Sequence, residues 1–167
     1  MIAAIWFHEQ STDFGEPVAV AGQKLAVADG DSFAIGTRRL RLDGIDAPEY
    51  RQPCNDAAGR PWECGKAARA SLEQMLREPG LACTAEARDR YARSIATCST
   101  TRSPDIAAAQ VLVGMAVSDE FYGMRSYGDE EDAARAARRG IWHGQFVLPS
   151  EWRDLHPARS IDTSPNK

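Results

Sequence analysis

Acidic and basic side chains gather in the stretch RLRLDGIDAPEY, residues 39–50, at a point where a strand would end. Asp46 and Glu49 lie three residues apart around a proline, and Arg41 lies just upstream. The run DGD supplies another carboxylate, Asp31. A turn after a strand favours Gly, Pro, Asn or Asp, but it needs neither two carboxylates nor a nearby guanidinium. The pattern therefore raises the question of a chemical role.

Phosphodiester hydrolysis would use these residue types. It needs a hard cation on the phosphate oxygens, a water held for attack, and positive groups that stabilise the charge developing at phosphorus. Asp31 and Asp46, at expected strand ends, can converge on one ion, and calcium accepts carboxylates, carbonyls and water together. Glu49 can hold the water as general base, while Arg41 and Arg93 can bind phosphate bidentately. Each signal is weak alone, because DGD is commonly an ordinary turn; the combination carries the hypothesis.

Short strands are predicted to position these residues. Apolar and polar residues alternate between turn signals over residues 24–28, 32–36 and 38–44, which is typical of strands. Residues 50–64 form a loop rich in Pro, Gly and Asn. Two further strands, joined by a polar turn around Asp89, are predicted downstream.

Three helices are predicted from the apolar periodicity and its flanking residues. The first spans residues 65–78 and ends at a Pro-Gly pair. The second begins with Ser103 as its N-cap and Pro104 in its first turn. The third spans residues 129–139, with acids in its first turn and arginines in its last, an order that suits the helix dipole.

This order of elements predicts an α+β, mainly β fold: a five-stranded OB-fold (Greek-key) barrel with three helices. The length of 167 residues suits one domain. We expect an N-terminal arm at residues 1–23, the domain at 24–148 and a polar C-terminal tail at 149–167. The apolar residues 1–7 are too short for a signal peptide; a remnant of a targeting or anchor segment and a terminal strand both stay open. No run reaches the roughly 20 apolar residues of a membrane span.

The net charge of −4 argues against a protein that coats nucleic acid nonspecifically, but it does not exclude an enzyme that acts on nucleic acid. The four cysteines, Cys54, Cys64, Cys83 and Cys98, include no CxxC pair and no histidine at zinc-ligand spacing. Their even number suggests disulfides, with three possible connectivities. Four buried free thiols are the alternative.

Taken together, the motifs VADGDSFAI, RLRLDGIDAPE, CGKAARASLEQML, DRYARSIATC, DIAAAQVLVGMA and EEDAARAARRGIW resemble the thermonuclease (staphylococcal nuclease) family over roughly residues 24–146. The resemblance implies an OB-fold barrel and calcium-dependent hydrolysis of DNA and RNA by attack of water, leaving 3′-phosphates. The expected substrates are single-stranded or open DNA and RNA, because a barrel groove admits a splayed strand more readily than a stacked one. A monomer is expected.

The resemblance also implies roles for individual residues. Asp31 and Asp46 look like the calcium carboxylates and the Ala47 carbonyl like a further ligand, with Ala standing where the family's type member has Thr. Glu49 looks like the residue that holds the attacking water at the calcium ion. The other matches are Arg41 and Arg93 as transition-state arginines, Arg90 and Tyr91 as contacts to a terminal phosphate, and Asp29 as an outer-shell carboxylate.

Two departures bear on the site. The family's usual Gly before the second arginine is Ala92 here, which could shift the hairpin and the placement of Arg93. The tyrosines that flank the base in the family's type member are not cleanly matched; Tyr122 and Tyr127 are the candidates.

The insert CNDAAGRPWEC and the second cysteine pair look like a bacterial exported branch of the family. This supports disulfides Cys54–Cys64 and Cys83–Cys98 and a periplasmic or secreted location. A different class of function is a non-catalytic, nuclease-like OB module that binds nucleic acid or a protein partner. Loss of the carboxylates or arginines would mark such a module, and the sequence retains all five of these residues. Hydrolysis is therefore the favoured hypothesis.

Overall fold

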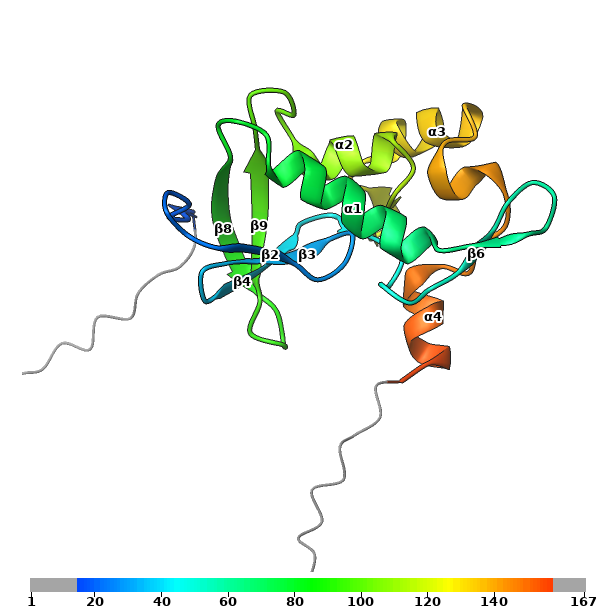
Figure 1. The fold of residues 1–167 in the computed structure, drawn as a ribbon, viewed down its shortest axis with the longest axis horizontal. Coiled ribbons are helices and arrows are strands. Elements are labelled where there is room, and N and C mark those ends of the chain that lie inside the picture. Colours follow the sequence, from blue (N-terminus) through cyan, green and yellow to red (C-terminus); the bar gives the residue numbers. More distant parts are fainter. Residues whose placement is uncertain (1–14, 158–167) are drawn as a thin grey trace, which may run out of the picture.

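The computed structural model describes residues 15–157, so the possible targeting remnant at residues 1–7 lies outside the described residues. Its largest element is a six-stranded sheet with the order β1-β8-β9-β4-β3-β2 (Figure 1). These strands are β1 (Glu16–Pro17), β2 (Leu25–Val27), β3 (Ser32–Ile35), β4 (Arg38–Leu42), β8 (Ala82–Arg88) and β9 (Ser94–Ser99). Neighbouring strands are antiparallel except β4 and β9, which pair in parallel.

Three short ladders complete the strands of the described region. They are β5 (Ile45–Asp46) with β10 (Val117–Ser118), β6 (Cys54–Asn55) with β7 (Pro61–Trp62), and β11 (Glu120–Phe121) with β12 (Met124–Arg125). The β5–β10 ladder continues from the end of β4 and carries Asp46, paired with Val117. It thus fixes the second predicted carboxylate beside the main sheet.

The helices of residues 15–157 are α1 (Cys64–Leu76), α2 (Ile106–Leu112), α3 (Gly128–Ala136), α4 (Pro149–Leu155) and a short 3₁₀ helix, η1 (Gly140–His143). Figure 1 shows α1 and α2 side by side across the sheet, α3 beyond α2, and α4 apart from them near the C-terminal end. None of these helices is long and apolar enough to cross a membrane.

The main core lies between the sheet and the first two helices. Its fully buried side chains include Leu40, Leu42, Leu72, Ile106 and Val111. Strand side chains alternate between faces, so the burial of Leu40 and Leu42 directs Arg39 and Arg41 away from the core. The apolar pattern of β4 thereby orients the arginine predicted to act in catalysis.

Strands predicted at 24–28, 32–36 and 38–44 are confirmed as β2, β3 and β4, but the barrel is not. The described strands form an open sheet flanked by short ladders, an OB-like arrangement in which β1 and β2 are edges. The prediction of three helices is also wrong: a fourth, α4, begins at Pro149 inside the predicted tail. Proline is favoured in a first helical turn because its missing N–H is unbonded there in any case.

The N-cap predicted for the second helix is corrected by two residues. Asp105 has extended backbone angles and its carboxylate accepts a hydrogen bond from Ala108 N at 3.1 Å, so Asp105 caps α2. Ser103 instead donates its hydroxyl to Glu78 at 3.3 Å. Both residue types are good caps, and tertiary contacts decide between them.

Both predicted disulfides are formed. Cys83 and Cys98 face each other in the β8–β9 register, whereas Cys54–Cys64 ties β6 to the first residue of α1. The first reinforces the sheet, and the second closes the loop beside α1. The described residues contain no free cysteine.

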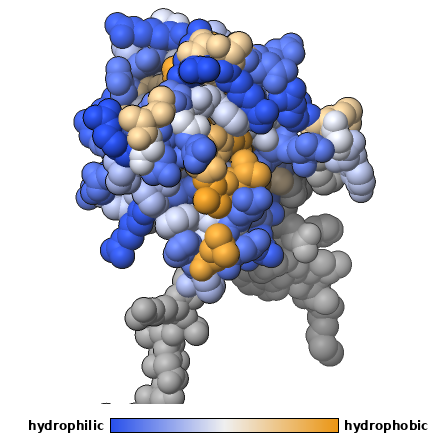
Figure 2. Space-filling view, turned by 90° about the vertical axis from the view of Figure 1, so that its right-hand side faces the viewer, coloured by the Kyte–Doolittle hydropathy of each residue, from blue (hydrophilic) through white to orange (hydrophobic). Residues whose placement is uncertain are grey.

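The surface is largely hydrophilic on the side shown in Figure 2, with a small group of apolar residues near the centre of the view. Exposed apolar side chains of the C-terminal part of the described chain are Val147, Leu148 and Leu155. They are few, as is usual on the surface of a small globular protein.

Candidate active site

Strand register brings the predicted residues together. Arg41 on β4 pairs with Ser32 on β3 and, across the parallel ladder, with Ile95 on β9. Asp31 directly precedes Ser32, and Arg93 lies two residues before Ile95. An aspartate and two arginines therefore lie close together where the neighbouring strands β3, β4 and β9 begin or end.

Arg41 bridges the two predicted metal carboxylates. Its Nη1 lies 2.7 Å from Asp31 Oδ1, and its Nη2 lies 3.1 Å from Asp46 Oδ1. Nη2 also donates to the Ile45 carbonyl at 3.0 Å. The second oxygen of Asp31 accepts a hydrogen bond from Ala47 N at 2.9 Å. The two carboxylates are thus held side by side, with side-chain exposures of only 3% and 6%.

Burial disfavours the ionised form of a carboxylate unless positive charge lies nearby. Burial raises the pKa of Asp31 to about 7, although the guanidinium of Arg41 opposes the shift. Partial burial, and then the charge of Asp46, also raise the pKa of Asp119, a residue that the sequence did not indicate. A cation placed here would favour the ionised forms.

The donor set fits a calcium ion. Two carboxylates supply hard oxygen ligands, the kind that Ca²⁺ prefers. Among residues 15–157, no three His, Cys, Asp or Glu side chains gather as a metal cage. Backbone carbonyls such as that of Ala47, and water, would therefore complete the six to eight oxygens that calcium takes.

The β8–β9 hairpin holds Arg93 through its own turn. Asp89 Oδ2 accepts a hydrogen bond from Arg93 Nε at 2.7 Å, while Oδ1 accepts from the backbone N–H groups of Tyr91 and Arg93, each at 2.9 Å. Burial raises the pKa of Asp89, but these hydrogen bonds outweigh it and the net pKa is lowered. Arg93 Nη1 also donates to Ser32 Oγ at 3.1 Å. Within this turn, Ala92 adopts the left-handed backbone conformation, with φ of 59°.

Tyr91 lies at the centre of a cationic cluster on the same hairpin. The guanidinium carbons of Arg90 and Arg93 lie 4.8 and 5.5 Å from the centre of its ring. Arg39 Nη2 donates to its backbone carbonyl at 2.6 Å. The ring is 55% exposed, so the pair predicted to contact a terminal phosphate is accessible from solvent.

Arg153 on α4 is a site residue that the sequence did not indicate. Its Nη1 and Nη2 lie 2.8 and 2.9 Å from the two oxygens of Asp46, and Nη1 lies 3.0 Å from Glu49 Oε1. The predicted polar tail thus supplies a second guanidinium, after that of Arg41, to Asp46. Pro149, followed by Ser150 and Glu151, was a helix-start signal that could have pointed to α4.

A cleft of about 720 Å³ lies between the β8–β9 hairpin, the end of β4 and α4. It is lined by Asp29, Arg39, Arg41, Glu49, Asp89, Arg90, Tyr91, Arg93, Ile95 and Arg153. Asp46 lines an adjoining cavity of about 520 Å³ together with Arg41 and Arg153. Tyr122, a predicted base-stacking residue, lies on the β11–β12 turn and lines neither cavity. Its role stays a prediction.

The sheet, the bridged carboxylates and the flanking arginines define a nuclease-like OB domain. The chain matches the family described as staphylococcal nuclease homologue over residues 39–144, and it belongs to that family. The match includes Arg41, Asp46, Glu49 and Arg93 but begins after Asp31.

Three curated proteins are similar to this chain. The succinoglycan biosynthesis protein ExoI of Rhizobium meliloti is 31% identical over 134 residues, covering 80% of this chain and 70% of ExoI. Protein ParB of Escherichia coli is 29% identical over 79% of this chain and 78% of its own length. The probable endonuclease LCL3 of Candida dubliniensis is 28% identical; the matched region spans 72% of this chain and about half, 54%, of that protein.

Proposed function

We propose that this protein is a calcium-dependent endonuclease that hydrolyses phosphodiester bonds of DNA and RNA. The observation that carries the proposal is the Arg41 bridge between Asp31 and Asp46, next to a cleft that Arg41, Glu49 and Arg93 line, in a nuclease-family domain. Similarity to a protein named a probable endonuclease supports the same reading. Retention of every charged residue of the expected set favours catalysis over a binding module.

Each residue has a proposed task. Asp31, Asp46 and the Ala47 carbonyl would hold the calcium ion, which when bound polarises the phosphate and stabilises its developing charge. Glu49 holds a water and accepts its proton as the water attacks phosphorus in line. Arg41 and Arg93 neutralise charge on the phosphate oxygens. The bond from phosphorus to the 5′ oxygen breaks, so the products carry 3′-phosphates.

Single-stranded or open nucleic acid is the proposed substrate. Five arginines and an exposed tyrosine line the cleft, and such a combination suits a splayed strand, since arginine binds the backbone and aromatic rings stack on bases. The net charge of −4 does not oppose this, because local charge governs binding. We propose a periplasmic or secreted location, since disulfides persist outside the cytosol.

The deciding experiment is release of acid-soluble nucleotides from single-stranded DNA in calcium and then in excess chelator. Asp46→Ala, purified identically, controls for contaminating nuclease. Hydrolysis that requires both calcium and Asp46 is the expected result. A folded wild-type protein without activity in calcium would instead favour the alternative of a binding module.

Glu49→Gln sharpens the assignment of the general base. The substitution keeps the size of the side chain but removes the charge that accepts a proton, so kcat should fall by about 10²-fold or more. Steady-state hydrolysis of single-stranded DNA measures this directly. Near-normal turnover with unchanged calcium dependence would remove Glu49 from that role.

A further inference from the structure

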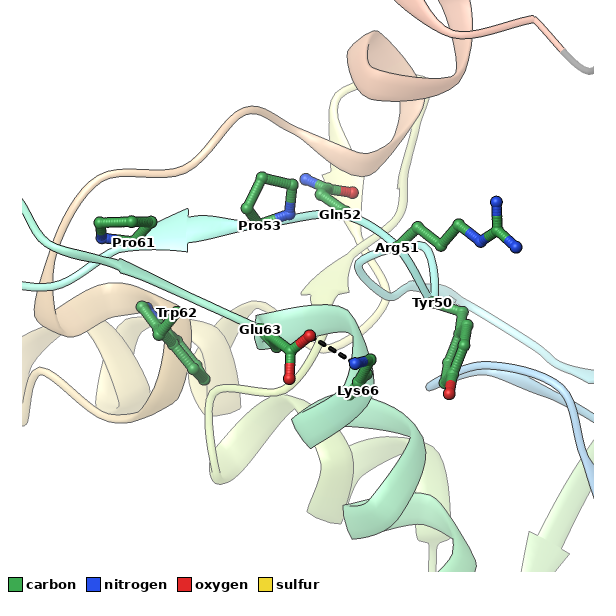
Figure 3. Close-up of a pocket in the computed structure, with 8 residues that line it drawn as sticks. All are labelled: Tyr50, Arg51, Gln52, Pro53, Pro61, Trp62, Glu63 and Lys66. Atoms are coloured by element: carbon green, nitrogen blue, oxygen red, sulfur yellow. Dashed lines mark hydrogen bonds and ion pairs between the residues drawn. The ribbon is translucent and has the colours of Figure 1, made fainter.

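A second cavity of about 580 Å³ lies next to the catalytic cleft (Figure 3). Its lining residues are Tyr50, Arg51, Gln52, Pro53, Pro61, Trp62, Glu63 and Lys66. In Figure 3 the rings of Tyr50 and Trp62 point to the same side of the β6–β7 hairpin, and the Glu63–Lys66 ion pair lies between them. Two aromatic rings therefore flank a pair that offers both a donor and an acceptor.

The walls of this cavity are fixed in place. The disulfide Cys54–Cys64 joins the hairpin to α1. Gln52 N donates to the Glu49 carbonyl at 2.7 Å, and the Gln52 amide donates to the Val147 carbonyl, also at 2.7 Å. A side chain at Gly65 would meet the Glu49 carbonyl oxygen at 1.8 Å, so α1 and the 49–52 turn are in close contact. A preformed cavity binds a ligand with less loss of entropy than a flexible one.

Tyr50 is partly exposed to solvent, and Arg69 packs against its ring. Its side chain is 41% exposed, and the guanidinium carbon of Arg69 lies 5.6 Å from its ring centre. Arg69 is itself held by a hydrogen bond from Nε to the Val27 carbonyl at 2.8 Å. Trp62 packs on the His143 ring at 5.2 Å between centroids. Both aromatic residues are thus positioned by contacts outside the cavity.

Continuity with the catalytic cleft identifies the occupant. Glu49 lines the cleft and Tyr50, the next residue, lines the second cavity. A strand whose scissile phosphate lies beside Glu49 would continue over Tyr50. Arg51 is exposed at the same turn and makes no ion pair within residues 15–157, so it is available to the next phosphate.

We propose that this cavity is a nucleoside-binding subsite that takes a base of the substrate strand beyond the two nucleotides that flank the scissile bond. The subsite rests on the proposed function. Tyr50 and Trp62 supply stacking surfaces, which accept any base because every base has a π-face. Glu63 and Lys66 can pair with polar groups of a base edge, and Arg51 binds the following phosphate.

The test is binding of fluorescein-labelled oligothymidylates of two and eight nucleotides, by anisotropy, in chelator so that no strand is cleaved. Tyr50→Ala should raise the Kd of the octanucleotide by about 5- to 100-fold, the range for loss of one stacked base. The dinucleotide, held chiefly by the arginines of the catalytic cleft, should change by less than about 2-fold. Tyr50→Phe keeps the ring and should restore octanucleotide binding.

Arg51→Ala tests the charge on the rim of the cavity. It should weaken octanucleotide binding more than its matched control, Arg60→Ala. Arg60 is an exposed arginine of the same loop that pairs with Asp56 and lies outside the lining of the cavity. The difference between the two variants should shrink as salt is raised, because phosphate contacts are screened.

The outcomes separate the subsite from the proposed function. Octanucleotide binding that is unchanged in Tyr50→Ala, or absent in the wild type, overturns the subsite. Calcium-dependent hydrolysis, measured in parallel, judges the nuclease independently. Binding that depends on Tyr50, in a wild-type protein that does not hydrolyse DNA, would uphold the subsite and reject the endonuclease.

Discussion

The two walls of the proposed catalytic cleft hold their arginines in different ways. On the sheet wall, Arg93 is bound by Asp89, four residues away in the same hairpin, at 2.7 Å. On the helix wall, Arg153 of α4 is bound by Asp46 and Glu49, more than a hundred residues away, at 2.8 and 3.0 Å. The Arg93 side chain is 23% exposed, and that of Arg153 is 42% exposed.

The difference is that the position of Arg93 is fixed, whereas that of Arg153 depends on what its partner carboxylates bind. Asp89 is not expected to bind metal or water in the reaction, so Arg93 can stay in place whatever occupies the cleft. Arg153 is held by the carboxylates that are expected to serve the metal and the attacking water. Its position therefore depends on what else those carboxylates bind. The sheet wall should act on the substrate, and the helix wall should act on the carboxylates.

Loss of Arg93 should give the largest effect. Arg93→Ala removes a preorganised charge from the phosphate, and kcat should fall by about 10²- to 10³-fold, as on removal of one oxyanion donor. Calcium affinity, measured by isothermal titration calorimetry, should stay within about 2-fold of wild type. Arg93→Lys keeps the charge without the planar fork and should recover only part of the activity.

Intact kcat in Arg93→Ala would contradict the assignment of the sheet wall. It would mean that the substrate phosphate lies out of reach of the hairpin. A large loss of calcium affinity in the same variant would show that Arg93 also acts through the carboxylates, and the contrast between the walls would disappear.

Loss of Arg153 should lower the rate of hydrolysis less than loss of Arg93 does, and it should raise the affinity for calcium. Arg153→Ala removes one of the two guanidiniums that hold Asp46 and frees its Oδ2, while Arg41 still contacts Oδ1. Calcium should therefore bind about 2- to 5-fold more tightly, the range for a partly exposed ion pair. The rate of hydrolysis at saturating calcium should fall by less than about 10-fold. Titration calorimetry measures the affinity, and hydrolysis of single-stranded DNA measures the rate.

Arg153→Lys is the matched control on the helix wall. It keeps a positive charge but cannot span the two oxygens of Asp46, so its calcium affinity should lie between those of the wild type and the alanine variant. A loss of rate in Arg153→Ala as large as that of Arg93→Ala would place Arg153 on the substrate itself.

The same contrast explains what the sequence could and could not predict. Asp31 directly precedes β3, Arg41 lies on β4 and a short turn joins these strands, so their proximity was predictable from local alternation. Arg93 joins them through the long-range β4–β9 pairing, for which only the family resemblance gave a sign. The place of Arg153 was not predictable, because its contacts are long-range and its polar surroundings resemble a frayed tail. Barrel closure failed for the related reason that pairing between distant strands leaves little local trace.

At Ala92, the hydrogen bonds of the turn outweigh the backbone preference of alanine. An alanine at φ of 59° sits in a left-handed conformation that costs an L-residue roughly 1–2 kcal/mol. The turn keeps this conformation because Asp89 accepts hydrogen bonds from the backbone of Tyr91 and Arg93. The substitution of Ala for Gly was expected to shift Arg93, but the ion pair between Arg93 and Asp89 is intact and holds the side chain in place.

Ala92→Gly should give the smallest effect and test the rigidity of the sheet wall. Glycine relieves the left-handed strain, but its unfolded chain has more entropy to lose, by about 0.5–1 kcal/mol. The net gain in unfolding free energy should be about 0.5–1 kcal/mol in urea denaturation, with kcat changed by less than about 2-fold. A clear rise in kcat would instead mean that Ala92 holds Arg93 off its best position. In that case the hairpin, and not only α4, would be an adjustable wall of the cleft.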